Sequence, residues 1–278
     1  MSCWLTIPSA RPPEEAEKAL SKWRAQGYKI ALMTDDQITR GVDVQLVSPP
    51  FGYPGYAAAI NQLVAMVMGE DAGVDWFVIG GDDVHPDPNH SAEEIAAQCC
   101  EYFMFHNAES SELGDAPELG DALQRTMDGE TAQTFGVMQP TGDRWGESPN
   151  HRYPAMRSAY IDRVAGSAWM GREFCKRVNG GRGPLWSGNP TAENPIDRQG
   201  YKHMFVDEEL RAVAVKLGIY WERRDLTHYH AHAGRVPNYT SAMIPPHLRK
   251  WNSATHWREA QALYSSRRDR GFPGSEPI

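Results

Sequence analysis

The chain has 278 residues, of which 41% are hydrophobic, and a formal net charge of −8, values that suit a globular protein of one large or two small domains. No window approaches the roughly 18 uninterrupted apolar residues of a membrane span, and the N-terminus lacks the basic flank and apolar core of a signal peptide, so we expect a cytoplasmic protein without a membrane span. The four cysteines show no metal-ligand spacing, which favours free thiols.

Strands and helices alternate in the first eighty residues. We expect strands at residues 3–7, 28–34 and 74–79, a short apolar run at 42–47, and helices at 13–26 and 56–68. This order is typical of an α/β fold with a mostly parallel sheet and helices on both faces.

The rest of the chain is less regular. We expect a helix from Ser91 to about His106, an acidic surface excursion at 107–132 and a strand at 135–139. A helix begins near Arg172, and residues 179–200, rich in Gly, Pro and Asn, form a long loop of the kind that closes over a substrate. Residues 206–210 open a further helix that runs to Leu217, and residues 267–278 are expected to be a disordered tail.

Two carboxylates, Asp82 and Asp83, follow the apolar strand at 74–79. The carboxyl ends of parallel strands form the ligand-binding edge of open α/β sheets, and Asp35 and Asp36 follow another strand in the same way. Adjacent carboxylates are costly to bury without compensation, which Mg²⁺ or Mn²⁺ supplies while bridging to phosphates. The alternative is that the pair only caps a turn.

Three histidines, His228, His230 and His232, lie two residues apart. If the segment is extended, their imidazoles share one face. Clustered histidines near paired acids favour a Mn²⁺-type site, whereas a single His is more often a core or surface residue.

The charge is distributed unevenly. Residues 1–144 hold 8 Lys and Arg against 23 Asp and Glu, a net of −15, and residues 145–278 hold 20 against 13, a net of +7. Basic groups interleaved with aromatics suit a nucleic-acid backbone and an extruded base, although two solvated faces would look the same. The groups concerned are Arg223-Arg224, Arg249-Lys250, Arg267-Arg268-Asp269-Arg270, Trp251, Trp257 and Tyr264.

Several motifs in residues 3–235 occur in an order that matches a known family. They are Pro8-Ser9-Ala10-Arg11 after the first strand, Asp35, Asn61 in the second helix, Gly81-Asp82-Asp83, Gly166–Gly171, Asp207 with Leu210, and His228–Gly234. In this combination they resemble nucleotide-sugar-dependent glycosyltransferases of the GT-A fold, especially the inverting family-two-like kind, viral members included. The chain departs from the family at three positions, with Gly81 for an Asp, Val206 for a Glu and Ala231 for a Pro.

The resemblance implies a division of labour along the chain. It implies a catalytic domain at 1–235, with a nucleotide-sugar-binding part at 1–144 and an acceptor part at 145–235, and a C-terminal extension at 236–278. Its metal ligands for Mn²⁺ or Mg²⁺ would be Asp83 with His230 and His228, and its base Asp207 with Glu208 as the fallback. Its donor-binding residues would be Pro8, Ser9, Arg11, Asp35, Asn61 and Asp82.

The implied function is metal-dependent transfer of a sugar from a nucleotide diphosphate sugar, with a UDP-sugar favoured, to an acceptor hydroxyl with inversion. The acceptor would be a glycan, or a hydroxymethylated pyrimidine in DNA of the kind that some viruses glycosylate, in which case the protein would act in a host cytoplasm. The alternatives are a nucleotidyltransferase, for which a Gly-rich phosphate loop is missing, and a non-catalytic metal- or glycan-binding module. Without the resemblance, Asp207 and Glu208 are ordinary acidic residues at a helix N-terminus.

Overall fold

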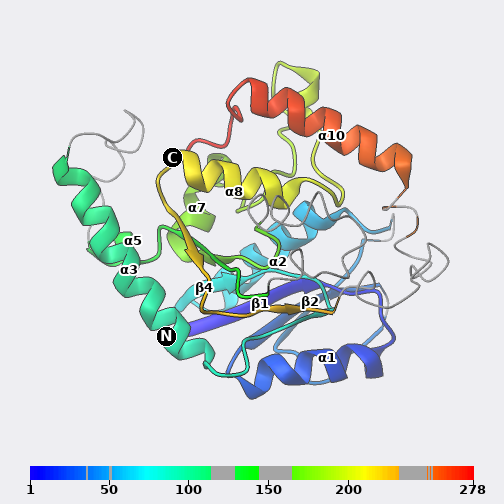
Figure 1. The fold of residues 1–278 in the computed structure, drawn as a ribbon. Coiled ribbons are helices and arrows are strands. Elements are labelled where there is room, and N and C mark those ends of the chain that lie inside the picture. Colours follow the sequence, from blue (N-terminus) through cyan, green and yellow to red (C-terminus); the bar gives the residue numbers. More distant parts are fainter. Residues whose placement is uncertain are drawn as a thin grey trace, which may run out of the picture.

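A seven-stranded sheet forms the centre of the protein (Figure 1). The computed structural model describes residues 1–35, 37–49, 52–113, 129–143, 165–231, 249, 251 and 253–278. The strand order is β3-β2-β1-β4-β7-β6-β8, and all neighbours are parallel except that β7 runs antiparallel to β4 and β6. The strands are β1 (Ser2–Pro8), β2 (Lys29–Thr34), β3 (Val44–Val47), β4 (Val74–Val78), β6 (Val137–Pro140), β7 (Trp169–Gly171) and β8 (Tyr220–Arg223).

Helices cover both faces of the sheet. On one face, α1 (Pro13–Ala25) and α3 (Ala92–Leu113) pack in a core that includes Trp23, Trp76 and Phe103. On the other face, α2 (Tyr56–Glu70), α7 (Arg172–Gly181) and α8 (Val206–Lys216) enclose a second core, and α10 (Ala254–Asp269) lies over them (Figure 1). The predicted α/β class with a mostly parallel sheet is confirmed.

The central strands are buried on both sides, and this explains why they are apolar throughout. In β1, Leu5 and Ile7 enter the core under α1, while Trp4 enters the core under α2. In β2, Ile30 and Met33 divide between the two cores in the same way. Successive side chains of a strand point to opposite faces, so a sheet covered by helices on both faces needs continuous apolar runs.

A small two-stranded sheet stands at the carboxyl edge of the large one. Its strands, β5 (Val84–His85) and β9 (Tyr229–His230), pair antiparallel, with Val84 opposite His230. This pairing brings the histidine segment, some 145 residues later in the chain, next to Asp83.

Several elements differ from the prediction. The helix α3 continues to Leu113, seven residues beyond its expected end, and a short helix α5 (Gly129–Gln133) lies within the expected excursion, of which residues 114–128 are outside the described part. The expected disordered tail is wrong, because α10 ends only at Asp269 and the backbone N–H of Ile278 donates to the Arg177 carbonyl at 3.1 Å.

The predicted substrate-closing loop at 179–200 is pinned to the body of the protein. It contains the 3₁₀ turn η3 (Pro195–Arg198), and the backbone of Leu185 is bound through both its N–H and its C=O to the amide of Asn61 on α2. The loop is therefore attached to α2 and packs against the core on that face of the sheet.

Among the residues described, no helix combines the length and the apolar character that crossing a membrane requires.

Replacing Gly171 by alanine tests the close packing around β7. A Cβ at this position would overlap the backbone carbonyl of Thr134, so we expect Gly171→Ala to lower the free energy of unfolding by about 1–3 kcal/mol. The matched control is Gly69→Ala in α2, where a Cβ meets nothing within 4 Å and alanine should raise stability by up to about 1 kcal/mol. Urea unfolding measures both, and equal effects would contradict the proposed overlap.

Candidate functional site

The carboxyl ends of the parallel strands bring several predicted site residues to one edge. Ser9 follows β1, and its backbone N–H donates to the Met33 carbonyl of β2 at 2.9 Å. Asp35, exposed, follows β2, and Asp82 and Asp83 follow β4. Asp36 and His232 lie outside the described residues.

Asp82 is held by the loop after β1. The Ser9 hydroxyl donates to Asp82 Oδ2 at 2.5 Å, and Arg11 Nε lies 2.9 Å from Asp82 Oδ1. The Arg11 backbone N–H in turn donates to Ser9 Oγ at 3.2 Å. Burial alone would lower the pKa of Arg11, but Asp82 and then Asp83 raise it above its ordinary value, so the guanidinium stays charged. Ser9, Arg11 and Asp82 thus form one connected polar group beside Pro8, the last residue of β1.

Asp83 turns the other way, toward the histidine segment. A tight turn, closed by the Val84 N–H on the Gly81 carbonyl at 3.1 Å, places Asp83 Oδ2 3.2 Å from His230 Nε2. The Ala231 N–H donates to the Asp83 carbonyl at 2.7 Å. Both side chains are about one third exposed.

Gly81 makes room for this arrangement. A Cβ at Gly81 would overlap Asp83 Oδ1, so a side chain there would displace the carboxylate from its position opposite His230. The glycine at position 81 therefore has a structural reason in this chain.

Asp207 is the second residue of α8 and lies within electrostatic range of His230. Its carboxylate accepts from the backbone N–H groups of Asp207 itself and Glu208, which is the favourable position for an anion at a helix N-terminus. Burial nevertheless raises the pKa of Asp207 above its ordinary value, while these hydrogen bonds and the charge of His230 act in the opposite direction. A carboxylate with a raised pKa is a better proton acceptor than an ordinary one. Gly166 faces this carboxylate, since a Cβ there would lie 3.7 Å from Asp207 Oδ2.

Three residues that the sequence analysis did not single out belong to the same site. The Tyr56 hydroxyl donates to the Gly80 carbonyl at 3.1 Å, and burial raises the pKa of Tyr56, with Tyr53, Asp207 and Asp83 adding to the shift. Burial lowers the pKa of His203, which Asp83 partly opposes. Asp143 Oδ2 accepts the His230 backbone N–H at 3.0 Å. No local pattern marks His203 or Asp143, because folding alone brings them here.

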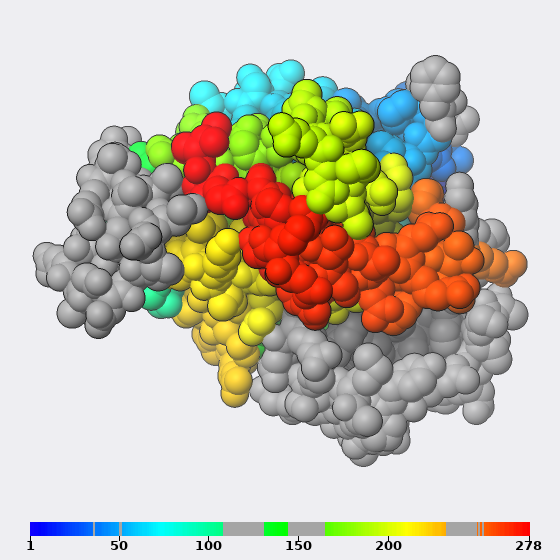
Figure 2. Space-filling view, turned by 90° about the horizontal axis from the view of Figure 1, so that it is seen from above, coloured from blue at the N-terminus to red at the C-terminus, as the bar shows by residue number. Residues whose placement is uncertain are grey.

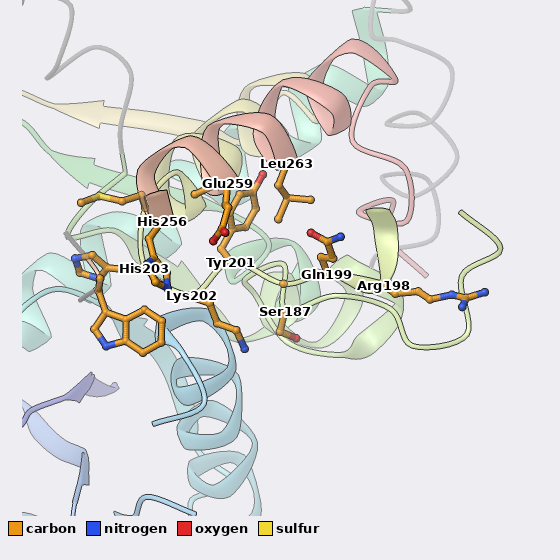
Figure 3. Close-up of a pocket in the computed structure, with 13 residues that line it drawn as sticks. Ser187, Arg198, Gln199, Tyr201, Lys202, His203, His256, Glu259 and Leu263 are labelled. Carbon is orange, nitrogen blue, oxygen red and sulfur yellow. The ribbon is translucent and has the colours of Figure 1, made fainter. Parts of the chain in front are cut away.

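A pocket of about 360 Å³ opens beside His203 (Figure 3). Trp251 forms an aromatic part of its wall and stands between Tyr53, at 6.0 Å, and His256, at 5.2 Å between ring centroids. Lys202, Gln199, Ser187 and Glu259 are among its polar lining residues. Its volume falls at the small end of ligand pockets and suits a single ring.

Asn61 is not among the groups that meet at this edge. Its Nδ2 donates to the Leu185 carbonyl at 2.7 Å and to Ser187 Oγ at 3.1 Å, and its Oδ1 accepts the Leu185 N–H at 3.1 Å. The amide thus attaches the loop to α2, and a role of Asn61 toward a donor stays a prediction.

His228 is also separate from the Asp83 pair. Its ring is buried and lies edge-on to Trp23, with centroids 5.1 Å apart, in the core under α1. The strand β9 covers only Tyr229 and His230, so His228 lies outside the strand on which the histidines were expected to share one face. The proposed metal ligand His228 is therefore a core residue in this structure.

The remaining pair, Asp83 and His230, suits a cation whose coordination shell is completed by a substrate. The part of the chain that the structure describes holds no group of three or more His, Cys, Asp or Glu side chains suited to a metal ion. Within the described residues, one carboxylate and one imidazole form part of a donor set, which phosphate and water oxygens would complete, as is usual for Mg²⁺ at diphosphates.

Five of the arginines that the sequence analysis singled out are paired with acids. Arg267 is fully buried, and the others lie beside carboxylates within 3.2 Å, so these arginines do not form an unpaired basic surface. Lys250 lies outside the described residues. The pairs are Arg223 with Asp225, Arg224 with Glu222, Arg267 with Glu209 and Asp197, Arg268 with Asp269, and Arg270 with Asp197.

No protein-family model matches the chain, and a search of curated proteins finds no match. The chemistry of the site is therefore the basis for its interpretation.

The buried imidazole of His228 should make stability depend on pH. Burial lowers its pKa to about 4 from an ordinary 6.5, so between these values the unfolded chain binds a proton that the folded chain does not. The contribution of His228 to the free energy of unfolding should be fully present above pH 6.5. It should fall by up to roughly 3 kcal/mol as the pH drops to about 4. Urea unfolding at several pH values gives the slope of the unfolding free energy against pH. This slope should be smaller in His228→Phe than in the control His106→Gln, and an equal slope in the two variants would contradict the lowered pKa of His228.

Proposed function

We propose that this protein is a metal-dependent glycosyltransferase of the GT-A fold that transfers a sugar from a nucleotide diphosphate sugar to an acceptor hydroxyl with inversion. The observation that carries the proposal is the Asp83 and His230 pair at the carboxyl edge of a mostly parallel sheet, with Asp207, a carboxylate of raised pKa, within electrostatic range of His230. A cation site beside a base is what this reaction needs.

The nucleotide is proposed to bind along the ends of β1, β2 and β4. Asp82, oriented by Ser9 and Arg11, would accept hydrogen bonds from the ribose, and Asp35 would meet the base. A divalent cation, Mn²⁺ or Mg²⁺, held by Asp83 and His230 would supply Lewis-acid stabilisation of the departing diphosphate.

The chemical step is a single displacement. The acceptor hydroxyl oxygen forms a bond to the anomeric carbon of the sugar, while the bond from that carbon to the diphosphate oxygen breaks on the opposite face. The hydroxyl proton passes to Asp207, and the electron pair of the broken bond leaves with the nucleoside diphosphate. Burial keeps Asp207 a stronger base than an exposed carboxylate, and Glu208 is the fallback for this role.

The pocket beside His203 is the proposed place of the acceptor ring. Trp251 offers an aromatic face on which a sugar or a base can stack, and Glu259 and Gln199 offer hydrogen-bonding groups. The ion pairs of the arginines reduce the support for DNA as the acceptor relative to the charge count alone, since a polyanion binds through unpaired basic groups. The glycan and the hydroxymethylated DNA are separated by the assay below.

The first test measures release of nucleoside diphosphate by mass spectrometry. Purified protein is incubated with a panel of nucleotide sugars and Mn²⁺, alone, with glycans, or with hydroxymethylated DNA. We expect release that requires the metal and falls at least about a hundredfold in Asp83→Asn, because a metal's charge stabilisation is worth several kcal/mol. Glu193→Gln, an exposed acid in the loop, is the matched control and should retain the rate.

The same assay separates the alternatives. Release of pyrophosphate from a nucleoside triphosphate, with no reaction of any nucleotide sugar, would indicate a nucleotidyltransferase. Binding of metal or glycan without turnover would indicate a non-catalytic module. Stimulation by the glycan or by the DNA would identify the class of acceptor.

The second test concerns the base. A base must be deprotonated, so activity should fall as the pH drops through the pKa of Asp207, which lies above that of an ordinary Asp. Asp207→Asn should lower kcat by about 10²–10⁴-fold and abolish this acid limb, whereas Glu208→Gln should keep both. The reverse result would transfer the role to Glu208, and activity retained in both variants would refute a carboxylate base on α8.

A further inference from the structure

A buried cluster of charges ties the C-terminal helix to α8 and to the pinned loop. Arg267 of α10 has 0% of its surface exposed. Its Nε and Nη2 donate to the two carboxylate oxygens of Glu209 at 2.7–3.1 Å, and its Nη1 donates to Asp197 Oδ1 at 3.1 Å. The guanidinium also stacks on Trp186, 3.4 Å from the ring centroid.

Each partner of Arg267 comes from a different element. Glu209 lies on α8, Asp197 on η3 and Trp186 in the loop before η3. Figure 2 shows the C-terminal segment, in orange and red, lying across the surface between the yellow-green loop and the yellow α8. One side chain therefore joins three segments that the sheet itself does not connect.

The charges in the cluster depend on one another. Besides its bonds from Arg267, Glu209 accepts a hydrogen bond from the Tyr201 hydroxyl at 2.7 Å. Asp197 accepts one from Arg270 at 2.7 Å. Arg270 is first among the groups that lower the pKa of Asp197. Without Arg267, the carboxylate of Glu209 would be left buried with only a neutral partner, which is strongly unfavourable.

The cluster lies two residues from each of two site residues. Asp207 precedes Glu209 by two positions on α8, and His203 follows Tyr201 by two positions in the loop. Between them the chain turns at Phe205, which holds a left-handed φ of 68° as the N-cap of α8. Fixing Glu209 and Tyr201 against each other therefore fixes both ends of the short segment that presents Asp207 and His203.

We propose that Arg267 is a positioning residue, which through Glu209 and Tyr201 sets Asp207 and His203 in place at the site. The inference rests on the proposed function for its catalytic consequence. A planar, bidentate guanidinium fixes direction as well as distance, which a lysine cannot reproduce. Arg267 does not touch the site, so its effect is on the geometry of the base.

The experiment compares Arg267→Lys and Tyr201→Phe with the control Arg268→Lys, whose side chain is exposed and paired only locally with Asp269. Nucleoside diphosphate release should show kcat about tenfold to hundredfold lower in Arg267→Lys, because misplacing a reacting group by about 1 Å costs up to about a hundredfold. The KM for the donor should stay near that of the parent, the acid limb of the pH profile should move, and Tyr201→Phe should show a smaller change of the same kind. Arg268→Lys should match the parent.

A second readout does not depend on activity. Hydrogen exchange should speed up in Arg267→Lys at the amides of 206–210 and at Ala165, whose N–H donates to the Asp207 carbonyl at 3.2 Å, and not in Arg268→Lys. If Arg267→Lys does not fold, Tyr201→Phe carries the same comparison. Parent-like kcat, pH profile and exchange in a folded variant would overturn the inference. Changed exchange without turnover in the parent would overturn only the proposed function.

Discussion

Repulsion between two neighbouring carboxylates is the constraint around which this edge of the molecule is arranged. Asp82 and Asp83 follow the same strand, and each is compensated by a different part of the chain. Asp82 is turned to Ser9 and Arg11 after β1, and Asp83 is turned to His230 on β9. The small sheet of β5 and β9, and the glycine at position 81, make this divergence feasible. A cation and the groups of a substrate would meet where the two halves of the chain come together.

The sequence carries much of the fold because strands buried on both faces must be apolar and helices must show one apolar side. The elements up to β4, and the edge of the sheet at which the polar residues gather, could be predicted on that ground alone. The reversal of β7 could not, since a three-residue strand has too few positions to reveal its direction. The sequence analysis missed that the C-terminal segment is ordered, because Arg267, Arg268 and Arg270 are polar. Folding buries the first of them against Glu209 and Trp186.

The candidate site was accessible to prediction only in part. Carboxylates at strand ends follow a general rule, and Asp82 and Asp83 obey it. The histidine pattern was ambiguous, because spacing by two defines a face only within a strand, and β9 begins after His228. Asn61 carries the right group but binds a loop more than 120 residues away, a contact that no local pattern contains. His203 and Asp143 have no signal of their own, since tertiary packing alone brings them to Asp83 and His230.

The attachment of the loop at Leu185 and at Asp197 bears on how substrates would be admitted. A loop held by hydrogen bonds at two points is ordered before any ligand binds. The conformational entropy of ordering it is then lost during folding and not during association. For this loop, binding would then proceed without an obligatory closing step. In the proposed reaction, donor and acceptor would bind in either order, and the rate of encounter would be limited by diffusion and desolvation more than by a slow rearrangement of the loop.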